Sequence, residues 1–379
     1  MRGKENRYLK WDNKTIGLIH EDNSVTFSNP CYNQVVRLYT QGETAWDSEK
    51  FTAFLAARII SRERRDIEKI LFRLGLTRYN VLAIADITRA IHPKDLLWIA
   101  GTETETFDSA ITGVFASVFH QRIDITGKSL DSPEGCNIKR YGVYNNHYGI
   151  YKQRLNPLST DAESERAVYL LAEKIGCACC PVFRTGADTV FSVFQYDFSR
   201  EYIVHFRHLF EGFQREGYGL PREGYGLRSE NEYHNLISLR PQYKNEIIKM
   251  LVLDFITRQD DRHLSNMAVK IRSIPGADNY TETFYPLYDN GRSLFYEDTE
   301  ETVQKAVADI GAYASSFGPE GTYWDHLQEI RGRGVHFRDL VNLDFTKDEI
   351  AAILTEAGFS GYRFEGSLDW ICKAAEMLE

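Results

Sequence analysis

Residues 257–269 read TRQDDRHLSNMAV, and residues 284–295 read FYPLYDNGRSLF. The first stretch follows a segment in which Ile247, Leu251 and Phe255 recur every four positions, the spacing of a buried helix face. Apolar alternation typical of a strand begins after the charged run. The second stretch is extended in the same way and stops at Asn-Gly, a strong turn signal. The two stretches therefore predict a buried helix, a charged loop and an extended run that ends in an aspartate.

The spacing of the polar residues in these stretches suits phosphoryl transfer. Asp261 lies in the loop, Asn266 follows five residues later, and Asp289 ends the second extended run. Phosphoryl transfer needs one carboxylate to orient and deprotonate the acceptor, and further oxygen ligands to hold Mg²⁺ on the phosphates. Protein kinases have the same Asp-to-Asn spacing, and their later aspartate begins Asp-Phe-Gly where this chain has Asp-Asn-Gly. Each motif also has an ordinary explanation, because Asn-Gly is a common turn and any exposed loop can contain Asp-Arg-His.

Two charged residues upstream would complete such a site. Lys152 ends the predicted strand GIYK, from which its ammonium group would reach phosphate oxygens. Glu165 follows thirteen residues later in a predicted helix, where it would pair with Lys152 and fix its direction. The alternative is that both are solvated surface charges, as most lysines and glutamates are. The order of the motifs along the chain favours the site.

Composition and charge restrict the class of protein. The chain has 379 residues, 43% of them hydrophobic, which is enough for two domains with substantial cores. The formal net charge of −9 disfavours a protein that coats nucleic acid, and we expect no direct nucleic-acid contact. Neither a run of about 18 apolar residues nor the apolar core of a signal peptide occurs, so we expect a cytoplasmic protein with no membrane contact.

The pattern of elements predicts an α+β, bilobal protein-kinase-like fold, with a small β-rich N-lobe, a mostly helical C-lobe and an N-terminal α/β appendage. The predicted boundaries are 1–125 for the appendage, 126–205 for the N-lobe and 206–379 for the C-lobe. The expected elements are a β-meander at 8–29, a helix at 47–76, an Asn-rich hairpin that ends near Lys152, and helices at 242–257, 300–317 and 346–378. A tandem REGYGL repeat at 215–227 predicts a surface loop.

Six stretches, taken in order, resemble one known family. They are SPEGCNIK, IYK, SERAVYLLAEKIG, VFQYDF, ITRQDDRHLSN and YPLYDNG, and together they span residues 129–295. This set resembles the HipA-like kinases, bacterial serine/threonine protein kinases often encoded as toxins beside a helix-turn-helix antitoxin. The resemblance implies an enzyme that uses ATP and Mg²⁺ and modifies a protein substrate, with translation-related proteins as the candidates and a helix-turn-helix antitoxin as a partner.

The resemblance also implies a role for each matching residue. Asp261 would be the catalytic aspartate, and His263 its companion near the phosphates. Asn266 and Asp289 would hold the metal, and Lys152 would bind phosphate. The remaining nucleotide contacts would come from the phosphate loop and the hinge: Ser132, Gly135 and Lys139, then Phe194, Tyr196 and Asp197. In this family the phosphate-loop serine can be autophosphorylated, which ejects the loop and switches the kinase off.

Some features depart from the family pattern and keep different functions open. Pro133 and Glu134 stand in the phosphate loop where small residues are usual. The DDRH spelling also resembles the loop of lipid kinases, but the residues after Asp289 are mostly acidic and do not suit a phosphorylated headgroup. The chain could also be a kinase of small molecules or a nucleotide-binding pseudokinase. The complete set of motif residues favours catalysis over a pseudokinase. The acceptor, the oligomeric state and the role of residues 1–125 stay open.

Overall fold

The computed structural model describes residues 7–60, 62, 67–92, 94–111, 139–197, 201–207, 209, 232–273, 280–317 and 321–379. The chain divides into two compact units. Unit 1 comprises Met1–Gln153, Tyr196–Val204 and Lys270–Thr283, and unit 2 comprises Arg154–Gln195, His205–Val269 and Phe284–Glu379. Two predictions lie outside the described residues: the role of Ser132 and Gly135 in the phosphate loop, and the surface loop at 215–227.

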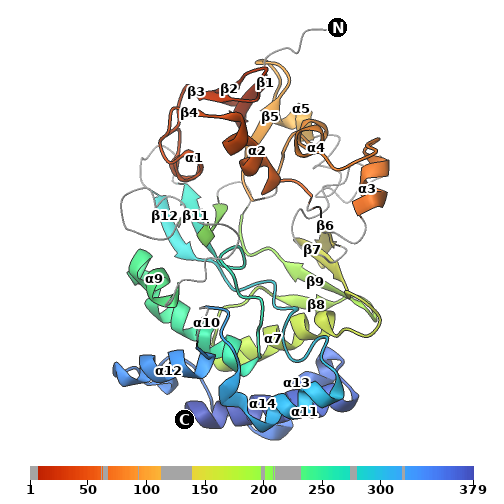
Figure 1. Cartoon of the computed structure of the whole chain (residues 1–379), viewed down its shortest axis with the longest axis vertical. Coiled ribbons are helices and arrows are strands. Elements are labelled where there is room, and N and C mark those ends of the chain that lie inside the picture. The colour runs from red at the N-terminus through yellow and green to blue at the C-terminus, as the bar shows by residue number, and fades with distance from the viewer. Residues whose placement is uncertain are drawn as a thin grey trace. The chain divides into compact units, whose positions relative to one another are not determined.

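Unit 1 contains a five-stranded antiparallel sheet with the strand order β4-β3-β2-β1-β5 (Figure 1). The strands are β1 (Arg7–Trp11), β2 (Lys14–Ile19), β3 (Val25–Phe27), β4 (Ala45–Trp46) and β5 (Leu97–Ala100). Asp12 turns β1 into β2 in the left-handed region at φ 49°, which aspartate tolerates better than most residues. The first three strands confirm the β-meander predicted for residues 8–29.

The helices described in unit 1 are α1 (Gln34–Thr40), α2 (Ser48–Ala56), α3 (Ile67–Arg73), α4 (Val81–Thr88) and α5 (Phe107–Ile111). The single helix predicted for 47–76 is wrong, because α2 ends at Ala56. Just beyond it, Arg58 is 7% exposed and makes two hydrogen bonds with the Asp95 carboxylate, at 2.7 and 2.8 Å. A buried charge needs such a partner, so this pair fixes the point where the chain leaves the helix.

A hairpin and a second sheet complete the strands around unit 1. Strands β6 (Lys139–Tyr144) and β7 (His147–Gln153) pair antiparallel and confirm the predicted Asn-rich hairpin. Asn145 and Asn146 form its turn with φ values of 48° and 63°, as a two-residue turn of type I′ requires. Strands β10 (Glu201–His205), β11 (Ala268–Ser273) and β12 (Tyr280–Phe284) form a three-stranded sheet in that order.

Unit 2 is mostly helical (Figure 1). Its described helices are α7 (Asp161–Ile175), α9 (Glu232–Leu239), α10 (Lys244–Ile256), α11 (Glu300–Ala308), α12 (Tyr323–Gly332), α13 (Lys347–Ala357) and α14 (Gly361–Leu378), beside a hairpin of β8 (Val182–Arg184) and β9 (Thr189–Val193). All residues from Met250 to Ile256 are buried, so the second half of α10 is enclosed on every side. Helix α13 packs on α7, and α14 packs on α11 and α13.

Two predicted helices of unit 2 are shorter than expected. The single helix predicted for 346–378 is wrong, because Gly358 ends α13 in the left-handed region at φ 97°. The Arg184 guanidinium lies against this glycine and donates to the Ala357 carbonyl at 3.1 Å. The helix predicted for 300–317 ends at Ala308. The helix predicted for 242–257 is confirmed by α10.

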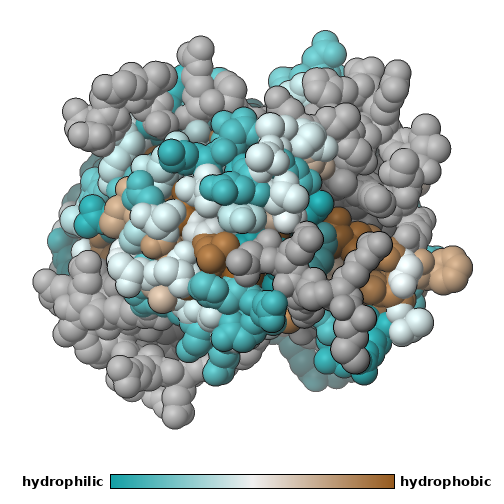
Figure 2. Space-filling view, turned by 90° about the horizontal axis from the view of Figure 1, so that it is seen from above, coloured by the Kyte–Doolittle hydropathy of each residue, from teal (hydrophilic) through white to brown (hydrophobic). Residues whose placement is uncertain are grey.

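Hydrophilic and intermediate residues cover much of the face seen in Figure 2, and hydrophobic residues show between them in separate patches. The most exposed large hydrophobic side chains described are Phe72 and Leu158, at 84% and 80%. They lie far apart in sequence, and scattered apolar side chains of this kind are normal on a protein surface. No described helix is both long enough and apolar enough to cross a membrane.

Candidate active site

The candidate site lies in unit 2, where α10 ends. Arg258 follows this helix in the left-handed region at φ 51°, so the chain turns sharply out of it. The Gln259 N–H donates to the Asp254 carbonyl at 2.9 Å and holds the turn against the helix. Residues 257–266, here named the DRH loop, therefore start from the buried end of α10.

Asp261 and Asn266 lie together in the DRH loop. The Asn266 side-chain nitrogen donates to the Asp261 carbonyl at 2.9 Å, and the Asp261 N–H donates to the Gln259 side chain at 2.9 Å. Asn266 is 3% exposed, so its orientation is fixed by its surroundings. Because its nitrogen makes that bond, its Oδ1 is the atom that remains for a donor or a cation.

Arg262 joins this loop to the second stretch. Its guanidinium, 1% exposed, contacts the buried Asp254 carboxylate of α10 at 2.9 and 3.1 Å. It also donates to the carbonyls of Asn266 and Tyr288, at 3.3 and 3.1 Å, and to Asn290 Oδ1 at 2.6 Å. Burial alone would lower the pKa of Arg262, but the Asp254 carboxylate raises it above the usual arginine value. One permanently charged group thus connects helix, loop and second stretch.

The second stretch, residues 284–295, is contacted by residues on two sides. Asn290 also donates to the Cys179 thiol at 3.3 Å. The Ser293 carbonyl accepts a hydrogen bond from the Ser164 hydroxyl of α7 at 2.7 Å. Gly291 lies so near α7 that an added Cβ atom would be 3.3 Å from the Asp161 carbonyl oxygen. A side chain at this position would press on helix backbone, so the glycine permits the close approach.

Asp289, the predicted metal ligand, lies in the chain between Tyr288 and Asn290, which both accept a hydrogen bond from Arg262. Its φ is 59°, an uncommon conformation for a residue other than glycine. Such a conformation persists where the surroundings impose it, which is frequent at functional sites. Here Arg262 imposes it by holding the Tyr288 carbonyl on one side and the Asn290 side chain on the other.

Three carboxylates and one arginine crowd at the surface of this site. Burial raises the pKa of Asp261, Arg292 opposes the rise at a distance of 3.4 Å, and the Asp289 carboxylate adds to it. Burial also raises the pKa of Asp260 to about 6, again opposed by Arg292, which lies 3.2 Å away. Carboxylates that disfavour each other's ionisation at close range are typical of sites that bind a cation or move a proton.

His263 and Glu165, two further predicted site residues, lie on different elements of unit 2. His263 is exposed, and its Nδ1 accepts the Ser265 N–H at 3.2 Å. Glu165 is 2% exposed on α7, and its Cγ would lie 3.5 Å from a Cβ added at Gly291. Glu165 therefore borders the second stretch.

The predicted phosphate-binding residues that are described belong to unit 1. Lys139 and Lys152 are partners across the β6–β7 hairpin, and each is 6% exposed. Like charges in directly opposite positions of a strand pair are unfavourable unless negative charge lies near them. The pairing of Lys152 with Glu165 of unit 2 stays a prediction.

The predicted hinge lies where the chain passes from one unit to the other, between Gln195 and Tyr196. Phe194 is half-buried on the unit 2 side, where the Gln195 N–H donates to the Tyr285 hydroxyl at 2.9 Å. On the unit 1 side, the N–H of the exposed Asp197 donates to a nearby glutamate at 2.8 Å. The adenine and ribose contacts assigned to this segment stay predictions.

Four residues of the site were missed from the sequence: Asp254, Arg262, Asn290 and Arg292. A signal was present for the first, because Asp254 lies within the apolar run MLVLDFI, and a carboxylate buried in a helix needs a cationic partner. That partner is the arginine eight residues later. Arg292 carries no pattern of its own, and its pairing with Asp260 and Asp261 is visible only in three dimensions.

Comparisons with known proteins agree with the fold. No protein-family profile and no curated protein sequence matches the chain. Among solved structures, it is similar to that of the Shewanella oneidensis MR-1 toxin–antitoxin system HipA and HipB with its operator DNA, with a TM-score of 0.51 and 14% identity, covering 98% of this chain and 96% of that chain. It is also similar to the Helicobacter pylori proinflammatory kinase CtkA, with a TM-score of 0.47 and 15% identity, covering 65% of this chain and 88% of that chain. The likeness to the Shewanella structure confirms the predicted α+β, protein-kinase-like fold class.

Replacing Arg262 by methionine is expected to lower the free energy of unfolding by about 3–5 kcal/mol, because the Asp254 carboxylate would stay buried without its cation. Urea unfolding followed by circular dichroism measures the change. Arg338→Met is the matched control, since Arg338 is 59% exposed in its pair with Glu379 and is expected to contribute about 1 kcal/mol or less. Equal losses in the two variants would contradict the organising role of Arg262.

Proposed function

We propose that this chain is an ATP- and Mg²⁺-dependent serine/threonine protein kinase of the HipA-like type. The observation that carries the proposal is the assembly of Asp261, Asn266 and Asp289 around one buried arginine. Their order and spacing are those of the catalytic and metal-binding residues of protein kinases. The kinase-like fold supports the same conclusion, while the substrate and the nucleotide rest on the proposal alone.

The residues present fit a magnesium ion. Asn266 offers an amide oxygen and Asp289 a carboxylate, and Mg²⁺ prefers oxygen ligands of this kind. The proposed site thus has two protein ligands. This number suits Mg²⁺, which usually keeps water molecules and takes its other ligands from phosphates. A cation would also offset the repulsion between Asp289 and Asp261.

Each residue of the site then has a chemical task. Asp261 would accept the proton of the acceptor hydroxyl and orient its oxygen for in-line attack on the γ-phosphate. Bound Mg²⁺ would supply neutralisation of the charge on the phosphates. Lys139 and Lys152 would hold phosphate oxygens as point charges, with Glu165 directing Lys152. The hinge residues Phe194, Tyr196 and Asp197, with Ser132 and Gly135 of the phosphate loop, would hold the rest of the nucleotide. His263 would stabilise the phosphates from the exposed side of the loop.

The same kinase would act on and bind other proteins. The acceptor would be a serine or threonine of a cytosolic, translation-related protein, and Ser132 of the chain itself would be a second acceptor. A helix-turn-helix antitoxin is the proposed partner, supported by the similar Shewanella structure, which contains HipA with HipB and operator DNA. We propose no direct contact of this chain with DNA, since its net charge is −9.

The test of this function is phosphosite mapping after incubation with Mg·ATP. Wild-type protein is expected to carry phosphate on Ser132 or another serine or threonine, and Asp261→Ala and Asp289→Ala are expected to lose at least about 10³-fold in rate. Asp369→Ala is the control, because Asp369 lies on α14 in an exposed pair with Lys347, outside the DRH loop and the second stretch. A metal-site variant that keeps its rate within tenfold of wild type would contradict the metal assignment. Binding of Mg·ATP without transfer to any acceptor would favour the pseudokinase instead.

The pH dependence of this activity should follow the charges around Asp261. The base must be ionised, so the rate falls as the pH drops through its raised pKa. Arg292→Ala removes a cation that lowers this pKa, so the acidic limb of the kcat/KM profile should move to higher pH. Asp260→Asn removes a neighbouring anion and should move it to lower pH. Arg292→Lys should restore most of the wild-type profile. Shifts in the same direction for Arg292→Ala and Asp260→Asn would contradict this electrostatic account.

A further inference from the structure

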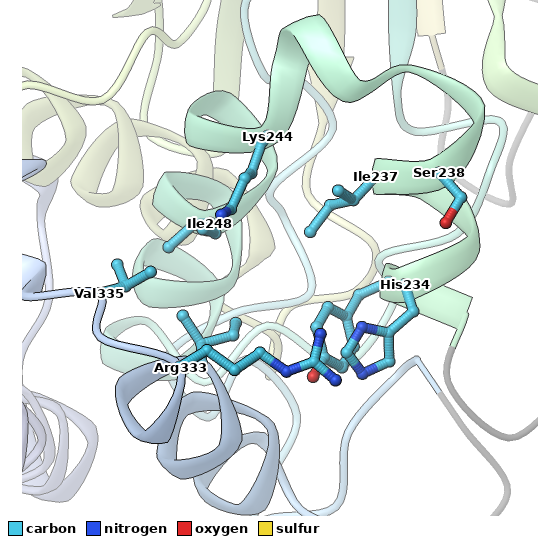
Figure 3. Close-up of a pocket in the computed structure, with 9 residues that line it drawn as sticks. His234, Ile237, Ser238, Lys244, Ile248, Arg333 and Val335 are labelled. Atoms are coloured by element: carbon cyan, nitrogen blue, oxygen red, sulfur yellow. The ribbon is translucent and has the colours of Figure 1, made fainter.

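A separate pocket lies in unit 2 between α9, the start of α10 and the end of α12 (Figure 3). Its volume is about 400 Å³, within the range of small-molecule sites. Two of these helices contribute residues at helical spacing: His234, Ile237 and Ser238 come from α9, and Lys244 and Ile248 from α10. The proposed function does not use any of them.

The pocket has an apolar floor. Ile248 and Ile330 are 1% and 3% exposed, and Tyr233 is 1% exposed. Ile237 and Val335 are half-buried beside them. The floor would therefore exclude water from a compact apolar group of a ligand, which is the usual source of affinity in such sites.

The rim of the pocket is cationic. Arg333 and His234 reach across from opposite sides, as Figure 3 shows, and both contact Glu329, at 2.7 and 3.1 Å. The Tyr233 hydroxyl donates to the same carboxylate at 2.5 Å and lowers its pKa. Three groups thus already satisfy Glu329. Lys244 is exposed, and its side chain has no hydrogen bond or ion pair with any described residue.

Charge and shape together define the ligand. Lys244 and Arg333 outnumber the one carboxylate that the described residues place at the rim, so an anion is favoured at this place. Ser238 lies on the same rim and would donate a hydrogen bond from its hydroxyl. We propose that this pocket binds a small amphipathic organic anion, with its apolar group on the isoleucine floor and its carboxylate or phosphate at Lys244 and Ser238.

A matched pair of probes tests whether the ligand needs an anionic group. 4-Phenylbutyrate and 4-phenylbutan-1-ol have nearly the same apolar body and differ in the anionic end. Isothermal titration calorimetry on the full chain is expected to give saturable binding of 4-phenylbutyrate with a Kd of about 1 mM or tighter. The alcohol should bind at least about tenfold more weakly. Equal binding of the two probes, or no saturable binding of the butyrate, would overturn the proposal.

Variants test whether the ligand binds in this pocket. Lys244→Ala should weaken binding of 4-phenylbutyrate about tenfold, whereas Lys305→Ala on α11, an exposed lysine far from the pocket residues in sequence, should leave it unchanged. Ser238→Trp should block the pocket without changing any charge, and Asn245→Trp, exposed on α10 outside the lining, is its control. Thermal unfolding of each variant establishes that it is folded. Binding that survives both Lys244→Ala and Ser238→Trp would place the ligand elsewhere and contradict the assignment.

Discussion

The contact of the Arg262 guanidinium with Asp254 is the interaction on which the candidate site depends. Both groups are buried, and neither would be tolerated there alone. The paired arginine has further N–H groups, which donate hydrogen bonds to the carbonyls of Asn266 and Tyr288 and to the Asn290 side chain. The DRH loop and the second stretch are separate segments of the chain. A single rigid fork of hydrogen bonds brings them together.

The electrostatics of the site follow from this assembly. Burial raises the pKa of Asp261, and holding the two stretches together brings the Asp289 carboxylate close enough to add to that rise. Arg292, half-exposed, compensates part of that cost through its contacts with Asp260 and Asp261. A site of this kind gains from a bound cation, because the cation removes a repulsion that the protein has already imposed. The proposed magnesium site is therefore a consequence of how the backbone is held.

The sequence predicted the elements of the site better than their connections. Helical periodicity identified α10, and the turn chemistry of Asn145 and Asn146 identified the β6–β7 hairpin, because both signals are local. The predicted helix at 346–378 failed although a local signal was present, because Gly358 is the residue type that ends a helix in the left-handed region. Arg262 was missed because its partners come from three segments, and only the fold brings them together.

Manganese binding in the presence of ATP, measured by electron paramagnetic resonance, tests most directly whether Arg262 assembles a nucleotide–metal site. The wild-type chain should bind Mn²⁺ only together with ATP, and Asp289→Asn should weaken that binding at least about tenfold while the fold is retained. Asp369→Asn, on the exposed surface of α14, should bind as wild type does. Nucleotide-dependent Mn²⁺ binding that is unchanged in Asp289→Asn, or its absence from the wild-type chain, would contradict the account.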